Sequence, residues 1–284
     1  NLVLETDILS RNQHVFKVPS LCENTPVLPS IHSPIYKKLI KAFSTVDSRS
    51  LIADHFVQPL TTVFKEIVKA GTTTTGPNEF VKAGPRTHLY FPPSEVRAAI
   101  VTCGGLCPGL NTIVRELVMS LHETYGVRDI YGVQYGMKGF YTYNWIQLKP
   151  STVLKIHKTG GTILGTSRGG FDVSKIMANV TKNNINQVYV VGGDGTLKAS
   201  LELQRYVSRK GLRVSIVNLP KTIDNDIPII DRSFGFLTSV DKAVEAINGA
   251  ECEAVCAEYG IGMVKLMGRH TGHIALEASL SHQG

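Results

Sequence analysis

The stretch VVGGDGTLKAS, residues 190–200, places two glycines, an aspartate and a third glycine between an apolar run and a segment with helical spacing. The preceding run, NQVYVVGG, is β-branched and apolar enough for a strand buried on both faces. The following segment, TLKASLELQRYVSRKG, repeats apolar residues at helical intervals. The stretch therefore predicts a strand-to-helix turn.

Glycines in such a turn let the backbone approach a ligand closely, and the free N–H groups at a helix start favour an anion. A tight strand-to-helix connection can also be glycine-rich without a ligand, so the turn alone leaves both interpretations open. Asp194 favours a phosphate site, because a carboxylate inside an anion-binding loop suits a cation held beside phosphates. Mg²⁺ is the expected cation, since it prefers carboxylate and phosphate oxygens together.

From Glu95 onward, apolar strands alternate with helical patterns. This alternation predicts an α/β fold, with a doubly wound, mostly parallel sheet and helices on both faces. The expected strands are 97–103, 129–136, 161–167, 186–193, 213–220 and 261–268, and the expected helices are 110–126, 173–184, 196–211, 239–258 and 270–283.

The N-terminal part differs, with prolines and short polar clusters around two helix-like stretches at 35–43 and 53–71. We expect an irregular N-terminal extension over residues 1–95, draped over a nucleotide-binding and catalytic α/β domain at 96–284.

The charge balance favours an acidic partner, because 30 Lys and Arg residues oppose 23 Asp and Glu residues and give a net charge of +7. The basic residues are scattered, which favours small phosphorylated ligands and indicates no nucleic-acid face. No apolar stretch is long enough to span a bilayer, and NLVLETDILS lacks the basic region of a secretory signal. We expect a cytoplasmic protein, or one of a plastid or other organelle, without a membrane partner.

Five cysteines are too few and too odd in number for a disulfide framework, so reduced thiols are expected. Cys103 and Cys107 could in principle form a four-thiolate zinc site with Cys252 and Cys256. Their C-x₃-C spacing is unusual for zinc, and the second pair lies on a helical pattern, where free cysteine commonly serves as a small hydrophobe.

Unusual residues come after five of the predicted strands: CGGLCPGLN, TSRGGFD, GGDGT, PKTIDND and MGRHTG. Ligands of parallel sheets bind outside the carboxyl ends of the strands, so these turns are expected to converge. Asp224 and Asp226 alternate in PKTIDND and could face one substrate, although Asn and Asp also favour plain turns. With a phosphate loop nearby, a general base for a substrate hydroxyl is the better interpretation, and Arg168 and Arg269 could balance phosphate charge.

In order and spacing, CGGLCPGLN, GGTILGTSRGG, GGDGT, PKTIDNDI, FGF and KLMGR resemble the 6-phosphofructokinases, over residues from about Glu95 to the end. GGLCPGLN with PKTIDND and the long extension looks most like the ATP-dependent plant and kinetoplastid branch. The resemblance implies ATP- and Mg²⁺-dependent phosphorylation of fructose 6-phosphate at the 1-hydroxyl, in glycolysis, by an allosteric homo-oligomer that is a tetramer when complete.

The resemblance also implies roles for individual residues. Asp224 matches the proton acceptor from the sugar hydroxyl, Asp226 its supporting carboxylate, and Asp194 the Mg²⁺ ligand. The matched nucleotide-contacting residues are Gly105, Arg168, Gly169, Gly193, Asp194, Gly195 and Thr196. The matched sugar-contacting residues are Thr222, Ile223, Asp224, Met267, Gly268 and Arg269, with Arg269 also expected to be catalytic.

Two positions bear on the phosphoryl donor. Lys221 stands where short bacterial enzymes carry glycine, and a lysine there resembles the pyrophosphate-dependent branch. Gly195 favours ATP, because pyrophosphate users typically carry an aspartate there, which would repel the α-phosphate of a nucleotide. Gly195 weighs more, since a lysine suits either donor.

Family members continue past the MGR turn into a second α/β half that supplies much of the sugar-phosphate pocket. This sequence begins at Asn1 without methionine and stops at Gly284, so we expect a fragment of a larger polypeptide, with apolar surface exposed. A pyrophosphate-dependent enzyme and a non-catalytic regulatory fragment are the alternatives. Lipid, sphingoid and NAD kinases share GGDGT, but they would not explain PKTIDND or KLMGR.

Overall fold

The computed structural model describes residues 88–227 and 230–282 without a break, together with 31–32, 34, 56–57, 62–64, 79–81 and 84. Most of the expected N-terminal extension, including the helix-like stretch at 35–43, therefore lies outside the described residues. Two short antiparallel pairs are described there: β1 (Ile31–His32) with β4 (His88–Leu89), and β2 (Thr62–Phe64) with β3 (Glu79–Val81). The helix expected over 53–71 is wrong at Thr62–Phe64, whose β-branched and aromatic side chains suit a strand.

A five-stranded sheet forms the centre of the α/β domain, in the order β7-β6-β5-β8-β9. Its four longer strands, which are parallel, are β5 (Arg97–Thr102), β6 (Asp129–Val133), β8 (Gln187–Gly192) and β9 (Ser215–Pro220). The edge strand β7 (Ile146–Gln147) runs antiparallel to β6 and was not expected. The predicted α/β fold with a mostly parallel sheet is confirmed.

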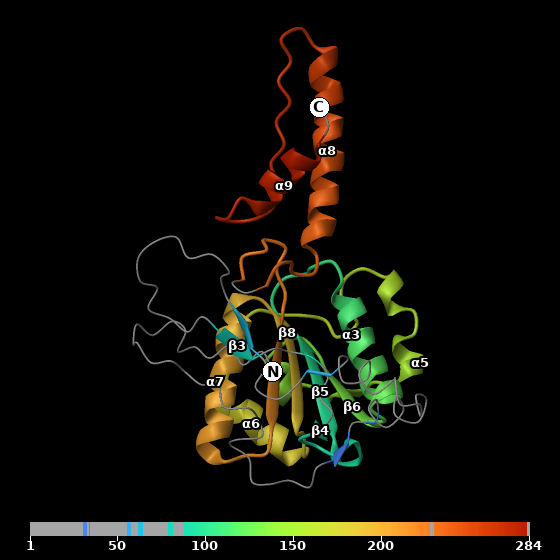
Figure 1. Ribbon diagram of the computed structural model, residues 1–284, viewed down its shortest axis with the longest axis vertical. Coiled ribbons are helices and arrows are strands. Elements are labelled where there is room, and N and C mark those ends of the chain that lie inside the picture. The colour runs from blue at the N-terminus through green and yellow to red at the C-terminus, as the bar shows by residue number, and fades with distance from the viewer. Residues whose placement is uncertain are drawn as a thin grey trace, which may run out of the picture.

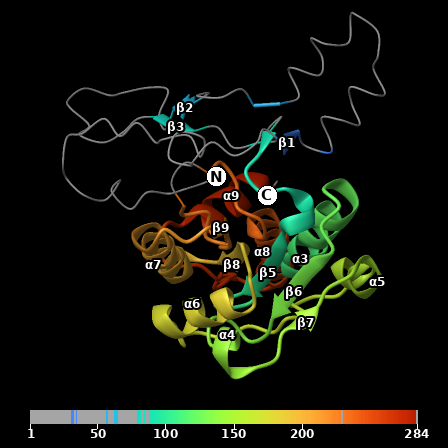
Figure 2. The same cartoon turned by 90° about the horizontal axis from the view of Figure 1, so that it is seen from below.

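Helices α3 (Leu110–Met119) and α6 (Val173–Lys182) cover opposite faces of this sheet, with α7 (Asp194–Lys210) on the face of α6. These three helices were predicted from sequence, as were α8 (Phe236–Cys256) and α9 (His273–Ser281), and α3 ends in a π-helical turn at Ser120–Thr124. The short helices α4 (Gly139–Thr142) and α5 (Pro150–Val153), and 3₁₀ turns at Pro93–Glu95 and Ile156–Lys158, were not predicted. Figure 2 shows the sheet between α3 and α5 on one side and α6 and α7 on the other.

Strand β5 explains why the domain has three layers. Its side chains alternate: Ala98 and Ile100 pack with α3 and α5, whereas Ala99 and Val101 pack with α6 and α7. All four are fully buried. A strand that is buried on both faces fixes the sheet between two helical layers, and its carboxyl end is directed to one edge of the domain.

Two expected strands are not strands. At 161–167 the chain turns instead, because Gly161 and Gly165 have positive φ angles of 77° and 63° and the Ile163 amide donates to the Asn111 side chain. Residues 261–268 run back beside α8 without pairing to any strand of the described part. An extended segment without a neighbour has no ladder hydrogen bonds to define it.

Helix α8 projects away from the α/β domain, and the chain returns along it to α9 (Figure 1). Its base is buried through Phe236, Val240 and Ala243. Large apolar side chains farther along are exposed, among them Val255 at 79%, Tyr259 at 93% and Met263 at 90%. No described helix is both long enough and apolar enough to cross a membrane.

Candidate active site

The turns that come after β5 and before α6 are bonded to each other. The Gly104 amide donates to the Ser167 carbonyl at 3.0 Å, and the Thr166 hydroxyl donates to the Gly104 carbonyl at 2.7 Å. Nη2 of Arg168 lies 3.7 Å from the point where a Cβ of Gly105 would stand. The lack of a side chain at Gly105 therefore lets the guanidinium lie over this turn.

The turn after β8 opens directly into α7. Gly193 is the N-cap residue, with Asp194 and Gly195 in the first helical turn. No atom lies within 4 Å of a Cβ built at Gly195, whereas a Cβ at Gly192 would collide with the Thr196 side chain. The start of α7 thus presents free amides, one carboxylate and open space, which suits an anionic ligand with a cation beside it.

The turn after β9 carries the two carboxylates, and Arg269 joins them. Its Nε lies 3.0 Å from Asp224 Oδ2, and its Nη2 lies 3.0 Å from Asp226 Oδ2. The Asp224 side chain is 8% exposed and that of Arg269 is 58% exposed, so the guanidinium covers a mostly buried acid. The hydrogen bond to Asp224 and the charges of Asp226 and Asp194 raise the pKa of the Arg269 guanidinium.

Short polar bonds hold this carboxylate turn in place. Thr222 Oγ1 donates to Asp226 and accepts from the Asp224 amide, at 3.2 and 3.0 Å. Asn225 has a positive φ of 52°, a conformation that asparagine tolerates, and its side chain bridges to the Asp231 carbonyl and the Ser233 amide. The shape of the turn is therefore supported by hydrogen bonds among the chain's own residues.

One carboxylate oxygen in the turn lacks a partner. Asp224 Oδ1 is buried and accepts no hydrogen bond from the residues that the structure describes, although Oδ2 is paired with Arg269. The Cβ position of Gly268 is 3.5 Å from this oxygen, so the glycine leaves space beside it. A buried acceptor without a donor is costly, which indicates that a donor belongs there in the working state.

Lys221 lies between the glycine turn after β5 and the glycine turn after β8. Its backbone amide donates to the Gly192 carbonyl at 3.0 Å, and its Nζ lies 3.6 Å from the Cβ position of Gly104. The residue is 8% exposed, and within 88–227 and 230–282 its ammonium has no hydrogen-bond or ion-pair partner. Burial lowers the pKa of the Lys221 ammonium. The thiols of Cys107 and Cys103 act in the opposite direction, and the nearby positive charge of Arg168 lowers the pKa again.

Two buried thiols line the same region. Burial raises the pKa of Cys103 to about 12 and also raises the pKa of Cys107, whose Sγ donates to the Phe234 carbonyl at 3.3 Å. Both thiols are therefore neutral at physiological pH. Cys252 and Cys256 are exposed on α8 instead, and the described part of the chain contains no cluster of three or more His, Cys, Asp or Glu side chains arranged for a metal.

The structure brings most of the predicted site residues to one edge of the sheet. Gly105, Arg168 and Gly169 lie in one pair of bonded turns, while Gly193, Asp194, Gly195 and Thr196 lie at the start of α7. Thr222, Asp224, Asp226, Gly268 and Arg269 form the carboxylate cluster. Two of the residues predicted to contact the sugar do not present their side chains to this cluster. Ile223 packs into apolar clusters, and Met267 is 79% exposed.

Several residues that build the site were not predicted to do so. The sequence motifs indicate for Lys221 only a bearing on the choice of phosphoryl donor, yet it is a buried cation facing the first glycine turn. The Thr271 hydroxyl and a ring nitrogen of His273 lie 3.2 Å from the Asp224 carbonyl, which links the carboxylate turn to α9. A lysine immediately after the apolar strand β9 was a signal for Lys221, but long-range backbone contacts leave no pattern in sequence.

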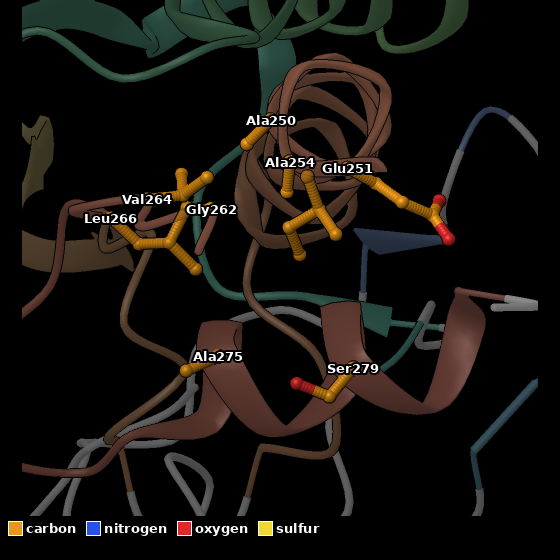
Figure 3. Close-up of a pocket in the computed structure, with 9 residues that line it drawn as sticks. Ala250, Glu251, Ala254, Gly262, Val264, Leu266, Ala275 and Ser279 are labelled. Carbon is orange, nitrogen blue, oxygen red and sulfur yellow. The ribbon is translucent and has the colours of Figure 1, made fainter. Parts of the chain in front are cut away.

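A cavity of about 400 Å³ lies elsewhere, between α8, α9 and residues 262–266 (Figure 3). Its lining is mainly small and apolar, including Ala250, Ala254 and Ala275. The carboxylate at its rim, Glu251, is paired with His282 at 3.1 Å. Polar side chains do not converge in the described lining of this cavity, whereas they do at the turns that follow β5, β8 and β9. The cavity therefore has no feature of a reaction site.

Comparison with known proteins gives a consistent result. Residues 97–284 match the family model described as Phosphofructokinase. The chain is 48% identical over 266 residues to ATP-dependent 6-phosphofructokinase 7 of Arabidopsis thaliana, covering 93% of this chain and 53% of that protein. It is 56% identical over 200 residues to ATP-dependent 6-phosphofructokinase 2 of the same plant, covering 70% of this chain and 45% of that protein.

Solved structures agree on the fold. A pyrophosphate-dependent phosphofructokinase from Marinobacter aquaeolei superposes with a TM-score of 0.57 at 20% identity, covering 66% of this chain and 50% of that one. At that identity the likeness concerns the fold alone. The chain spans about half the length of the curated relatives it matches.

Proposed function

The chain belongs to the phosphofructokinase family, and from that premise we propose that it forms the nucleotide-binding and catalytic part of an ATP-dependent 6-phosphofructokinase. One observation carries the proposal: a buried carboxylate with a free oxygen, Asp224 Oδ1, is held in the same cluster of strand ends as the open start of α7. A phosphoryl acceptor and a phosphoryl donor need those two features at one edge of the sheet.

In this proposal Asp224 accepts the proton of the sugar 1-hydroxyl through Oδ1, the oxygen that has no partner in the described part of the chain. Asp226 and Thr222 hold the turn at the observed distances. Arg269 holds Asp224 in place through its ion pair with Oδ2. The charge of Asp194 also raises the pKa of Arg269, so the guanidinium is close enough to that side of the site to balance phosphate charge during transfer.

The nucleotide is proposed to place its phosphates between the glycine turn at Gly104 and Gly105 and the first turn of α7. Arg168 and Lys221 supply positive charge there. The carboxylate of Asp194 fits a hard cation beside those phosphates, and Mg²⁺ would neutralise part of their charge when bound. Gly193, Gly195 and Thr196 would contribute backbone amides to the phosphates, and the open space at Gly195 would accommodate them.

Pyrophosphate is the second candidate donor, because Lys221 provides a buried cation that would serve a bare diphosphate equally well. The open space at Gly195 favours ATP, since a nucleotide needs room for the α-phosphate and for the nucleoside attached to it. The full-length protein is proposed to be a glycolytic homotetramer of the cytoplasm or a plastid. Residues 1–95 and 96–284 remain the proposed division into extension and α/β domain.

The proposed activity is tested by fructose 6-phosphate-dependent ADP release with Mg·ATP. A full-length phosphofructokinase that contains this 284-residue sequence is expected to release ADP only when both the sugar phosphate and Mg²⁺ are present. The isolated chain is expected to release none above background. Equal turnover with pyrophosphate would contradict the choice of donor, and absence of turnover with either donor would indicate a non-catalytic role.

A further inference from the structure

We propose that Lys221 is a reactive lysine that forms an imine with small phosphorylated aldehydes. The inference does not rest on the proposed function, because it concerns the chemistry of one amine and not turnover. It starts from the placement of Lys221 at the end of β9, where its Nζ points toward the Gly104 turn.

The surroundings of Lys221 lack the anion that normally holds a lysine in its charged form. No carboxylate among residues 88–227 and 230–282 pairs with it. The facing groups are the thiols of Cys103 and Cys107 and the guanidinium of Arg168. Because burial keeps both thiols neutral and Arg168 repels a second positive charge, the ammonium is destabilised relative to the amine.

The free amine is the form that attacks a carbonyl carbon. An ordinary lysine has roughly one unprotonated amine in 2,500 molecules at pH 7, and each unit by which the pKa falls raises that fraction about tenfold. Burial lowers the pKa of Lys221. Lys242 on α8 differs in its surroundings, because it is exposed and its Nζ is ion-paired with Glu245 at 2.7 Å. Lysines desolvated in apolar pockets form imines with carbonyl substrates in other enzymes.

The same surroundings select a phosphate-bearing aldehyde. Gly104 carries no side chain, and a Cβ there would stand 3.6 Å from Nζ, so the proposal places the approaching aldehyde on this side of the amine. Arg168 and the amides at the start of α7 then offer sites for the phosphate of the same molecule. In the reaction the Lys221 amine adds to the aldehyde carbon, a C–N double bond forms, and the carbonyl oxygen leaves as water.

Pyridoxal 5′-phosphate is a suitable probe for this chemistry. The full 284-residue chain is treated at neutral pH with a limiting amount of the probe, and borohydride then delivers hydride to the imine carbon to give a stable secondary amine. Peptide mass spectrometry measures the labelled fraction at each lysine. We expect Lys221 to be labelled several-fold faster than Lys242, because burial lowers the pKa of the Lys221 ammonium and Lys242 is exposed and ion-paired.

Two controls sharpen the test. Pyridoxal, which lacks the phosphate, is expected to label Lys221 several-fold more slowly than pyridoxal 5′-phosphate does. The Lys221→Arg variant should lose the fast-labelled fraction, whereas Lys242→Arg should keep it. If Lys221→Arg fails to fold, the comparison of Lys221 with Lys242 labelling in the unaltered chain still tests the proposal. Labelling of Lys221 no faster than of Lys242, or equal labelling by both probes, would overturn the proposal.

Discussion

Replacing Asp224 by asparagine is expected to lower kcat by about a hundredfold or more in a full-length phosphofructokinase that carries this sequence. Asparagine keeps the size of the side chain and can still accept a hydrogen bond, but it cannot take a proton at neutral pH. Asp224→Ser should have a similar effect. The KM for ATP should change little, because Asp224 lies in the carboxylate turn and not in the first turn of α7.

Asp241→Asn is a matched control for this experiment, because it makes the same chemical change at an exposed position on α8. It should leave kcat unchanged. Steady-state kinetics with fructose 6-phosphate and Mg·ATP measure both variants. If Asp224→Asn keeps kcat within a few-fold of the parent, another group accepts the proton and the role assigned to Oδ1 is wrong.

Replacing Gly195 by aspartate is expected to weaken ATP binding by roughly tenfold or more, while use of pyrophosphate changes far less. A side chain at this position enters space that is open in the structure. Its negative charge would stand beside the nucleotide phosphates, and like charges repel. An acidic residue in the first turn of a helix stabilises the helix by about 0.3–1 kcal/mol, so lost binding would not reflect unfolding.

Gly249→Asp provides the control, since Gly249 is another helical glycine with no atom within 4 Å of its Cβ position. It lies on α8 and should not alter the KM for ATP. The measurement is the KM for ATP and for pyrophosphate in each full-length variant. An equal loss for both donors after Gly195→Asp would show that this position does not distinguish them.

The sequence predicted the layers of this fold because side-chain alternation and helical spacing are local patterns. Strands β5, β8 and β9 and helices α3, α6, α7, α8 and α9 agree with such patterns. The segment 261–268 has the same apolar character as those strands, yet the described residues give it no strand neighbour. Strand formation depends on a partner, which a local pattern does not contain.

The candidate site was predictable to a similar extent. Glycine and carboxylate turns at strand ends identified the edge of the sheet and the residues Asp194, Asp224 and Asp226. The free oxygen Asp224 Oδ1 and the buried ammonium of Lys221 were not predictable, because they depend on which side chains pack around them. Likewise, the exposed position of Met267 on the returning chain has no counterpart in the motif that contains it.

Calorimetric titration of the isolated chain with Mg·ATP and with fructose 6-phosphate tests most directly whether it holds the nucleotide part of a phosphofructokinase site. We expect weak but measurable binding of Mg·ATP, because the glycine turns, Lys221 and the start of α7 are all present. We expect little or no binding of fructose 6-phosphate, since the chain spans only about half the length of the curated relatives it matches. Tight binding of the sugar phosphate, or no binding of Mg·ATP by the folded chain, would contradict this account.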